Sequence, residues 1–182
     1  MSRLRSTIAF VAVVLALGCG GDGGKGRAPA PASSFTPDAP EPAGPAIFLR
    51  GRPSADSATE SLDVVARGIE RPIHGAALRI HWDPALVHFR SAQAGEHWSP
   101  HAIALAKEGA PGELAIVWSE KGDTPGVLAS DDTVLGTIDL ERRTESADVG
   151  IRADRSTLRD GDGAPLDTSW TGGRLEARSP PR

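Results

Sequence analysis

The strongest constraint on the fold is the spacing of apolar residues, which occupy alternate positions in short runs from residue 46 onward. In one run Leu78, Ile80 and Trp82 alternate with other residues. Successive side chains of a β-strand point to opposite sides, so this spacing buries one side of each strand and leaves the other in water. Further runs lie at 62–66, 87–89, 114–118, 134–140, 149–151 and 175–177.

Turn-forming residues stand between these runs. Gly, Pro and Asp gather at Asp83-Pro84 and within 109–112, 122–126, 160–163 and 172–173. Many short strands separated by regular turn signals predict an all-β, antiparallel β-sandwich of about nine strands. Residues 103–107 are the one segment here that we interpret as a helical turn.

The N-terminus has the features of a secretory signal. Arg3 and Arg5 precede an apolar run at 8–17, which is shorter than the ~20 residues that span a bilayer. Ala16-Leu17-Gly18-Cys19 resembles the lipobox of bacterial lipoproteins, and the resemblance implies that Cys19, the only cysteine, is lipidated. Residues 1–18 are then a lipoprotein signal peptide, and the outer membrane is the favoured location. The alternative is an ordinary cleaved signal followed by an incidental cysteine.

Composition divides the rest of the chain. Residues 19–45 are rich in Gly, Pro and Ala and predict a flexible tether, which as a coil reaches roughly 30 Å. Residues 46–178 hold the strand pattern, and 179–182 are expected to be a disordered tail. The net charge of −4 becomes −6 when Arg3 and Arg5 leave with the signal, so the sequence predicts no nucleic-acid partner.

A longer motif covers residues 75–95. Gly75 precedes the alternating strand 76–81, Trp82-Asp83-Pro84 forms a corner, and a second strand runs from Ala85 to Gly95. This order resembles the cohesin domain, the receptor module of cellulosome scaffolds. Residues 134–140 resemble a later cohesin strand, and 158–177 resemble the closing hairpin of that family, with its turn at 160–163. The resemblance implies a jelly-roll sandwich and a dockerin-type protein partner, carried by an enzyme that degrades polysaccharides.

In cohesins the recognition surface is one sheet that includes the strand before the Asp-Pro corner and the strand that corresponds here to 114–118. With the apolar residues of these strands turned inward, the outward residues become the predicted partner-binding set: Ala77, Arg79, His81, Ala115, Val117 and Ser119. We expect Arg79 and Val117 to contribute to binding and little to folding.

The alternative function is a carbohydrate-binding module, which would need an exposed aromatic ring. The chain has no tyrosine and four tryptophans. Trp82 and Trp118 fall in phase with core residues, and Trp170 precedes the last strand. Trp98 lies in an irregular segment, so it is the predicted carbohydrate-binding residue in this alternative.

Other sites are not supported by the sequence. The histidines at 74–101 show no metal-binding spacing and are interpreted as solvated strand residues. The turn at 160–163 has Ala164 and Pro165 where a calcium loop needs an oxygen ligand and a glycine, so a tight turn is predicted in place of a calcium site. No arrangement of nucleophile and base is apparent, so we expect a non-catalytic module without a cofactor or metal.

Overall fold

A computed structural model of the protein describes residues 33–39, 42–53, 58–143 and 145–177. In these residues the chain forms fourteen β-strands and one 3-10 turn, η1 (Ala153–Arg155), so the fold is all-β as predicted. Nine strands have five or more residues and five have three, so the predicted number of about nine corresponds to the longer strands. Cys19, the signal peptide and the C-terminal tail of the sequence analysis lie outside the described residues.

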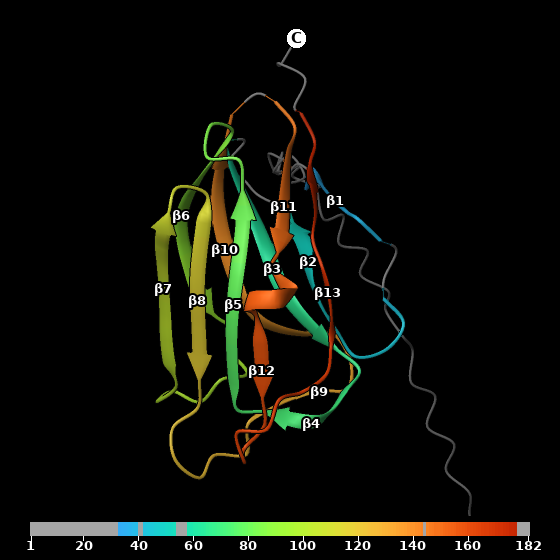
Figure 1. Ribbon diagram of the computed structural model, residues 1–182, viewed down its shortest axis with the longest axis vertical. Helices are drawn as coiled ribbons and strands as arrows, with labels where there is room; N and C mark the ends of the chain where they lie inside the picture. Colours follow the sequence, from blue (N-terminus) through green and yellow to red (C-terminus); the bar gives the residue numbers. More distant parts are fainter. Residues whose placement is uncertain (1–32, 40–41, 54–57, 144, 178–182) are drawn as a thin grey trace, which may run out of the picture.

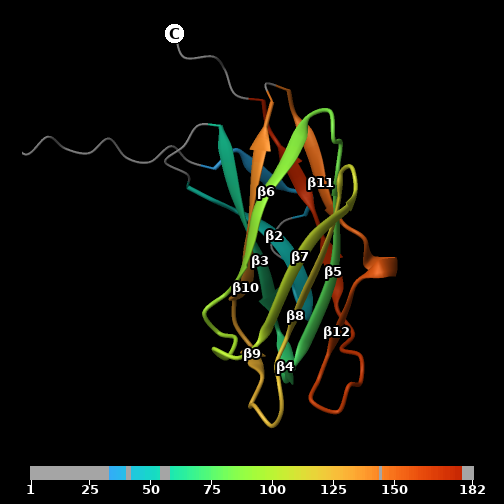
Figure 2. The same cartoon turned by 90° about the vertical axis from the view of Figure 1, so that its left-hand side faces the viewer.

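The strands form two packed layers, which Figure 2 shows edge-on. The larger sheet has the order β1 (Phe35–Pro37), β14 (Gly173–Leu175), β11 (Ala147–Ile151), β5 (Gly75–Trp82), β8 (Glu113–Ser119) and β7 (Ile103–Ala110), and β12 (Thr157–Arg159) pairs with β5 below β11. The other layer has the order β13 (Ser169–Thr171), β2 (Ala46–Arg52), β3 (Thr59–Arg67), β10 (Thr133–Arg142) and β6 (Val87–Ala94). A small pair, β4 (Ile69–Ile73) and β9 (Val127–Ala129), lies at one end (Figure 1).

The core fills the space between the two layers. Leu78, Ile80 and Trp82 of β5 are buried, as the alternation predicts. Trp118 of β8 is 1% exposed and lies against Gly136 of β10, where an added Cβ would come within 2.2 Å of the indole ring. Glycine at this position therefore lets the tryptophan of one sheet meet the backbone of the other.

The Asp-Pro corner has the geometry that its residues favour. The side chain of Asp83 accepts a hydrogen bond from the backbone N–H of Ala85 at 2.8 Å. The backbone oxygen of Asp83 also accepts from the N–H groups of Leu86 and Val87, at 3.0 Å each. Aspartate and proline stabilise turns in this way, and this turn delivers the chain from β5 to β6 in the opposite layer.

The turn at 160–163 is a tight turn, as predicted. Oδ1 of Asp160 accepts hydrogen bonds from the backbone N–H groups of Asp162 (3.1 Å) and Ala164 (2.8 Å), and the other carboxylate oxygen pairs with Arg71. Across it Arg159 and Pro165 form an antiparallel bridge, and the N–H of Leu166 donates to the backbone oxygen of Leu158 at 3.0 Å. The expected closing hairpin therefore begins at this turn but does not continue to residue 177. β13 pairs in parallel with β2 of the opposite sheet, and β14 returns to pair with β11. Each of these strands has three residues, and its backbone N–H and C=O groups find their hydrogen-bond partners in the sheet that it joins.

Two further expectations were wrong. Residues 103–107 are not a helical turn but the first part of β7, which pairs with β8 along its length. The folded domain also begins before residue 46, since Phe35 of β1 is buried and pairs with Leu175. The Pro-rich composition around β1 predicts a tether and not a strand. The strand can form there because β1 lies at the edge of its sheet, where proline is tolerated.

No helix in the described part of the chain is long and apolar enough to cross a membrane.

Candidate binding face

The outward side of β5, β8 and β7 is the surface on which the predicted partner-binding residues meet. We call it the binding face. All six predicted residues lie on it and are half-buried or exposed: Ala77, Arg79, His81, Ala115, Val117 and Ser119. Figure 1 shows these three strands side by side in the front layer. The structure therefore gathers the predicted set on one surface, while its role in binding stays a prediction.

The register of the strands adds residues that the sequence analysis missed. Val117 pairs with Ala77 of β5 on one side and with Leu105 of β7 on the other. Because paired residues point to the same side of a sheet, Leu105 belongs to the binding face, as does Ile103 opposite Ser119. The interpretation of 103–107 as a helical turn concealed both residues. Their outward position follows from the pairing of β7 with β8, which alternation along the chain does not give.

These residues form an apolar patch on the binding face, made up of Ala77, Ile103, Leu105, Ala115 and Val117. Within the described residues, the structure exposes four large hydrophobic side chains, and Ile103 (36%), Leu105 (62%) and Val117 (37%) are three of them. Scattered apolar residues are normal on a protein surface, but a contiguous group is typical of an interaction site. A hollow of about 170 Å³ borders the patch beside Ala77, Val117 and Thr157.

Basic side chains border the patch. Lys107 and Arg79 lie on either side of Ala115 in the strand register. Next to them Glu113 accepts two hydrogen bonds from Arg155 of η1, at 3.0 and 3.1 Å. The guanidinium groups of Arg152 and Arg79 lie 3.8 and 4.0 Å from the same carboxylate. One carboxylate thus faces three guanidinium groups, which we call the arginine cluster.

The opposite sheet presents a different surface, the polar face, on the outward side of β2, β3, β10 and β6. Asp139 accepts hydrogen bonds from Ser61 and Ser91, both at 2.7 Å. Asp63, which is 7% exposed, accepts from Thr137 at 3.1 Å and lies 3.7 Å from Arg52. The polar side chains of this face therefore satisfy one another.

Asp132 extends this network at its edge. It pairs with Arg67 and with Arg50, the latter at 2.9 Å. The hydrogen bond from Arg67 contributes most to a lowered pKa of Asp132, assisted by the positive charges of Arg67 and Arg50 and opposed in part by burial. The carboxylate is thus held in its charged form.

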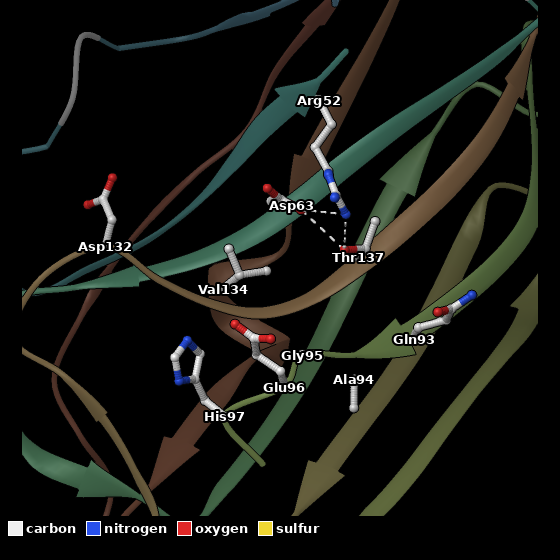
Figure 3. Close-up of a pocket in the computed structure, with 10 residues that line it drawn as sticks. All are labelled: Arg52, Asp63, Gln93, Ala94, Gly95, Glu96, His97, Asp132, Val134 and Thr137. Carbon is white, nitrogen blue, oxygen red and sulfur yellow. Dashed lines mark hydrogen bonds and ion pairs between the residues drawn. The ribbon is translucent and has the colours of Figure 1, made fainter. Parts of the chain in front are cut away.

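A polar pocket of about 400 Å³ opens on the polar face (Figure 3). Arg52, Asp63 and Thr137 are joined by hydrogen bonds and an ion pair on one side of it, and Glu96 and His97 lie on the other. No Trp, Tyr or Phe ring of the described residues lines it. The described residues hold no group of three or more His, Cys, Asp or Glu side chains that could bind a metal ion.

The carbohydrate-binding alternative loses its predicted residue. Trp98 is 6% exposed, and its Nε1 donates a hydrogen bond to the backbone oxygen of Leu135 at 2.8 Å. The prediction of an exposed ring was wrong, because the irregular loop after β6 folds inward and places the indole in the core. The other tryptophans are buried, or half-buried in the case of Trp170, so no tryptophan ring in the described residues is exposed for stacking on a sugar.

The comparisons with known proteins bear on the fold. No family model and no curated protein matches the sequence. Solved structures do match. The sixth cohesin of Acetivibrio cellulolyticus scaffoldin B, solved with a mutant Cel5 dockerin, has a TM-score of 0.64 at 17% identity, covering 75% of this chain and 100% of that one.

Two further cohesins agree. The OlpA cohesin of Clostridium thermocellum, solved in a type I cohesin–dockerin complex, has a TM-score of 0.60 at 15% identity, covering 74% of this chain and 99% of that one. A non-cellulosomal cohesin of Archaeoglobus fulgidus has a TM-score of 0.54 at 11% identity, covering 72% of this chain and 89% of that one. The predicted resemblance is thereby confirmed at the level of structure, and the domain has the cohesin fold.

Proposed function

We propose that this domain is a non-catalytic adhesion module whose binding face docks a dockerin-type protein domain. The observation that carries the proposal is the apolar patch, in which Ile103, Leu105 and Val117 are exposed together on one side of one sheet. Exposed apolar groups gain free energy when a partner removes them from water. A fold alone does not fix function, so the argument depends on this surface and not on the sandwich.

Two observations support a protein as the partner. Two of the matching cohesins were solved in complex with dockerins. The binding face also has the composition of a protein interface, with aliphatic side chains at its centre and charged ones at its border. A polysaccharide surface would call for exposed rings, and the tryptophans of this chain are buried or half-buried. We infer further that the partner belongs to a polysaccharide-degrading enzyme. This inference rests on the resemblance to cohesins.

The test compares two leucines of matched exposure. Leu105 on the binding face is 62% exposed, and Leu128 on β9, away from that face, is 66% exposed. The probe is a panel of purified dockerin modules from the genome that encodes this chain, and binding is measured by calorimetry. We expect Leu105→Asp to weaken binding by about 100-fold or more, because a buried charge at an interface centre is strongly unfavourable.

Leu128→Asp is the control and should bind like the unmodified protein. Both variants should melt within a few degrees of it, since exposed positions contribute little to folding. The proposal fails if no dockerin module binds, or if Leu105→Asp binds as well as Leu128→Asp.

We also propose that the protein is anchored to the cell envelope through lipid on Cys19, at the outer membrane, with the residues that follow acting as the tether. The sequence Ala16 to Cys19 supports this proposal. Metabolic labelling with palmitate should mark the full-length chain and leave Cys19→Ser unlabelled. Equal labelling of the two proteins would refute lipidation at Cys19, and fractionation of the labelled cells would identify the membrane.

A further inference from the structure

The charge of the binding face differs from that of the whole chain. The protein carries a net charge of −4, or −6 without its signal segment. The outward charged residues of the three strands of the binding face are Arg79, Lys107 and Glu113, and Arg152, Asp154 and Arg155 lie at η1 beside Glu113. An acidic protein thus presents a locally basic surface, which attracts acidic partners and repels basic ones.

The arginine cluster has spare hydrogen-bonding capacity. Each guanidinium carries five N–H donors, and Glu113 is the one carboxylate of the described residues that pairs with the three arginines. Between a third and a half of each arginine side chain is exposed to solvent. Planar, exposed guanidinium groups bind carboxylates in a bidentate manner, so the cluster can accept further carboxylates from outside.

The hollow beside Ala77 defines a second element of recognition. Its lining is mainly aliphatic and small, with Ala77 and Val117 at the side of the apolar patch. Arg79 is two residues further along the same strand, about 7 Å from Ala77 at the usual rise of a strand. An apolar side chain in the hollow and a carboxylate on the cluster would therefore come from neighbouring parts of one partner surface.

We propose that the partner presents an acidic surface, in which an apolar side chain fills the hollow beside Ala77 and flanking Asp or Glu residues bind Arg79, Arg152 and Arg155. This inference rests on the proposed function and specifies the chemistry of the dockerin surface that fits. The adjacent apolar patch favours a protein over an acidic polysaccharide, because carboxylate recognition alone would leave Leu105 and Val117 in water.

The test is selection from a displayed library of dockerin modules in which exposed positions vary among acidic, neutral polar and basic residues. The unmodified protein should recover modules enriched in Asp and Glu. Their dissociation constants should rise about tenfold or more between 0.05 and 0.5 M NaCl, because salt screens charges at an interface rim. The variant Arg79→Glu with Arg155→Glu should recover modules enriched in Lys and Arg instead.

Two further variants separate charge from folding. Arg79→Gln with Arg155→Gln removes the positive charge without adding a negative one, and should weaken binding of acidic modules about tenfold or more. Arg90→Glu is the control, since Arg90 pairs with Glu141 on the opposite sheet as Arg155 pairs with Glu113. It should recover the same acidic modules as the unmodified protein, and melting temperatures would show that all variants are folded.

The outcomes distinguish this inference from the proposed function. If modules bind through the binding face but show no enrichment in carboxylates, or bind both double variants equally well, the acidic-partner inference is overturned while the proposed function stands. If no module binds at all, both are overturned. Binding of polygalacturonate that is lost in the double variants, with no dockerin recovered, would replace the protein partner with an acidic polysaccharide.

Discussion

The two outward faces of the sandwich differ in how their side chains are satisfied. On the polar face Asp63 and Asp139 accept hydrogen bonds from neighbouring strands of the same sheet. On the binding face the apolar side chains of Leu105 and Val117 are exposed, and three arginines share Glu113. A face that satisfies its own polar groups gains little from a partner, whereas exposed apolar groups and spare donors gain much. The difference indicates which side of this fold is available for recognition.

The largest effect that we predict concerns Trp98, which is buried and directly follows Glu96 and His97 of the polar pocket in the loop after β6. Trp98→Ala should lower the free energy of unfolding by about 3–5 kcal/mol, because removing a buried aromatic ring leaves a cavity. Urea denaturation followed by circular dichroism measures it. A loss below about 1 kcal/mol would mean that the ring is exposed in solution, and would restore the carbohydrate-binding alternative that names Trp98.

The next effect tests the polar face itself. Asp63→Ala removes the acceptor of the Thr137 hydroxyl and the ion-pair partner of Arg52. It should lower the free energy of unfolding by about 1–3 kcal/mol, the penalty for an unsatisfied polar group. Dockerin binding should not change.

The matched change on the binding face is Leu105→Ser. It should lower the free energy of unfolding by less than about 0.5 kcal/mol, since Leu105 is mostly exposed. It should nevertheless weaken dockerin binding. The comparison of the two faces is contradicted if Asp63→Ala reduces binding and Leu105→Ser reduces stability.

The smallest effect is a dependence of stability on acid pH. The pKa of Asp132 is lowered, chiefly by its hydrogen bond from Arg67. A folded-state pKa below the unfolded value means that protons bind the unfolded chain more readily, so this stabilisation is present above the unfolded pKa of about 4 and is lost as the pH falls through the lowered value. Asp132→Asn should remove this part of the pH dependence. Melting curves between pH 2 and 7 would test it, and an unchanged pH profile in the variant would count against the Arg67 pair.

Much of the fold follows from the sequence because alternation and turn chemistry act locally. The strands at β3, β5, β6, β8, β10 and β11 coincide with apolar runs. The inward side of β5 and β8 is also the one that the alternation predicts. Asp83 and Asp160 form the turns expected of them, because their carboxylates bond to backbone amides only two to four residues away.

The short strands could not be predicted in this way. β1, β12, β13 and β14 have three residues each, too few to show a period, and they form because long-range partners satisfy their backbone. β7 was missed for a different reason. All its residues are exposed, so it has no inward apolar row to mark it as a strand.

The sandwich, its main turns and the six outward residues of β5 and β8 follow from the sequence, since each depends on periodicity or on neighbours along the chain. The packing of distant segments places Leu105 beside Val117, buries Trp98 and brings three arginines around Glu113, and none of these could be predicted locally. Arg79 and Arg155 are far apart in the sequence, and nothing local specifies that both meet one carboxylate. The pairing of β5 with β8 and the position of η1 beside them bring these charges together.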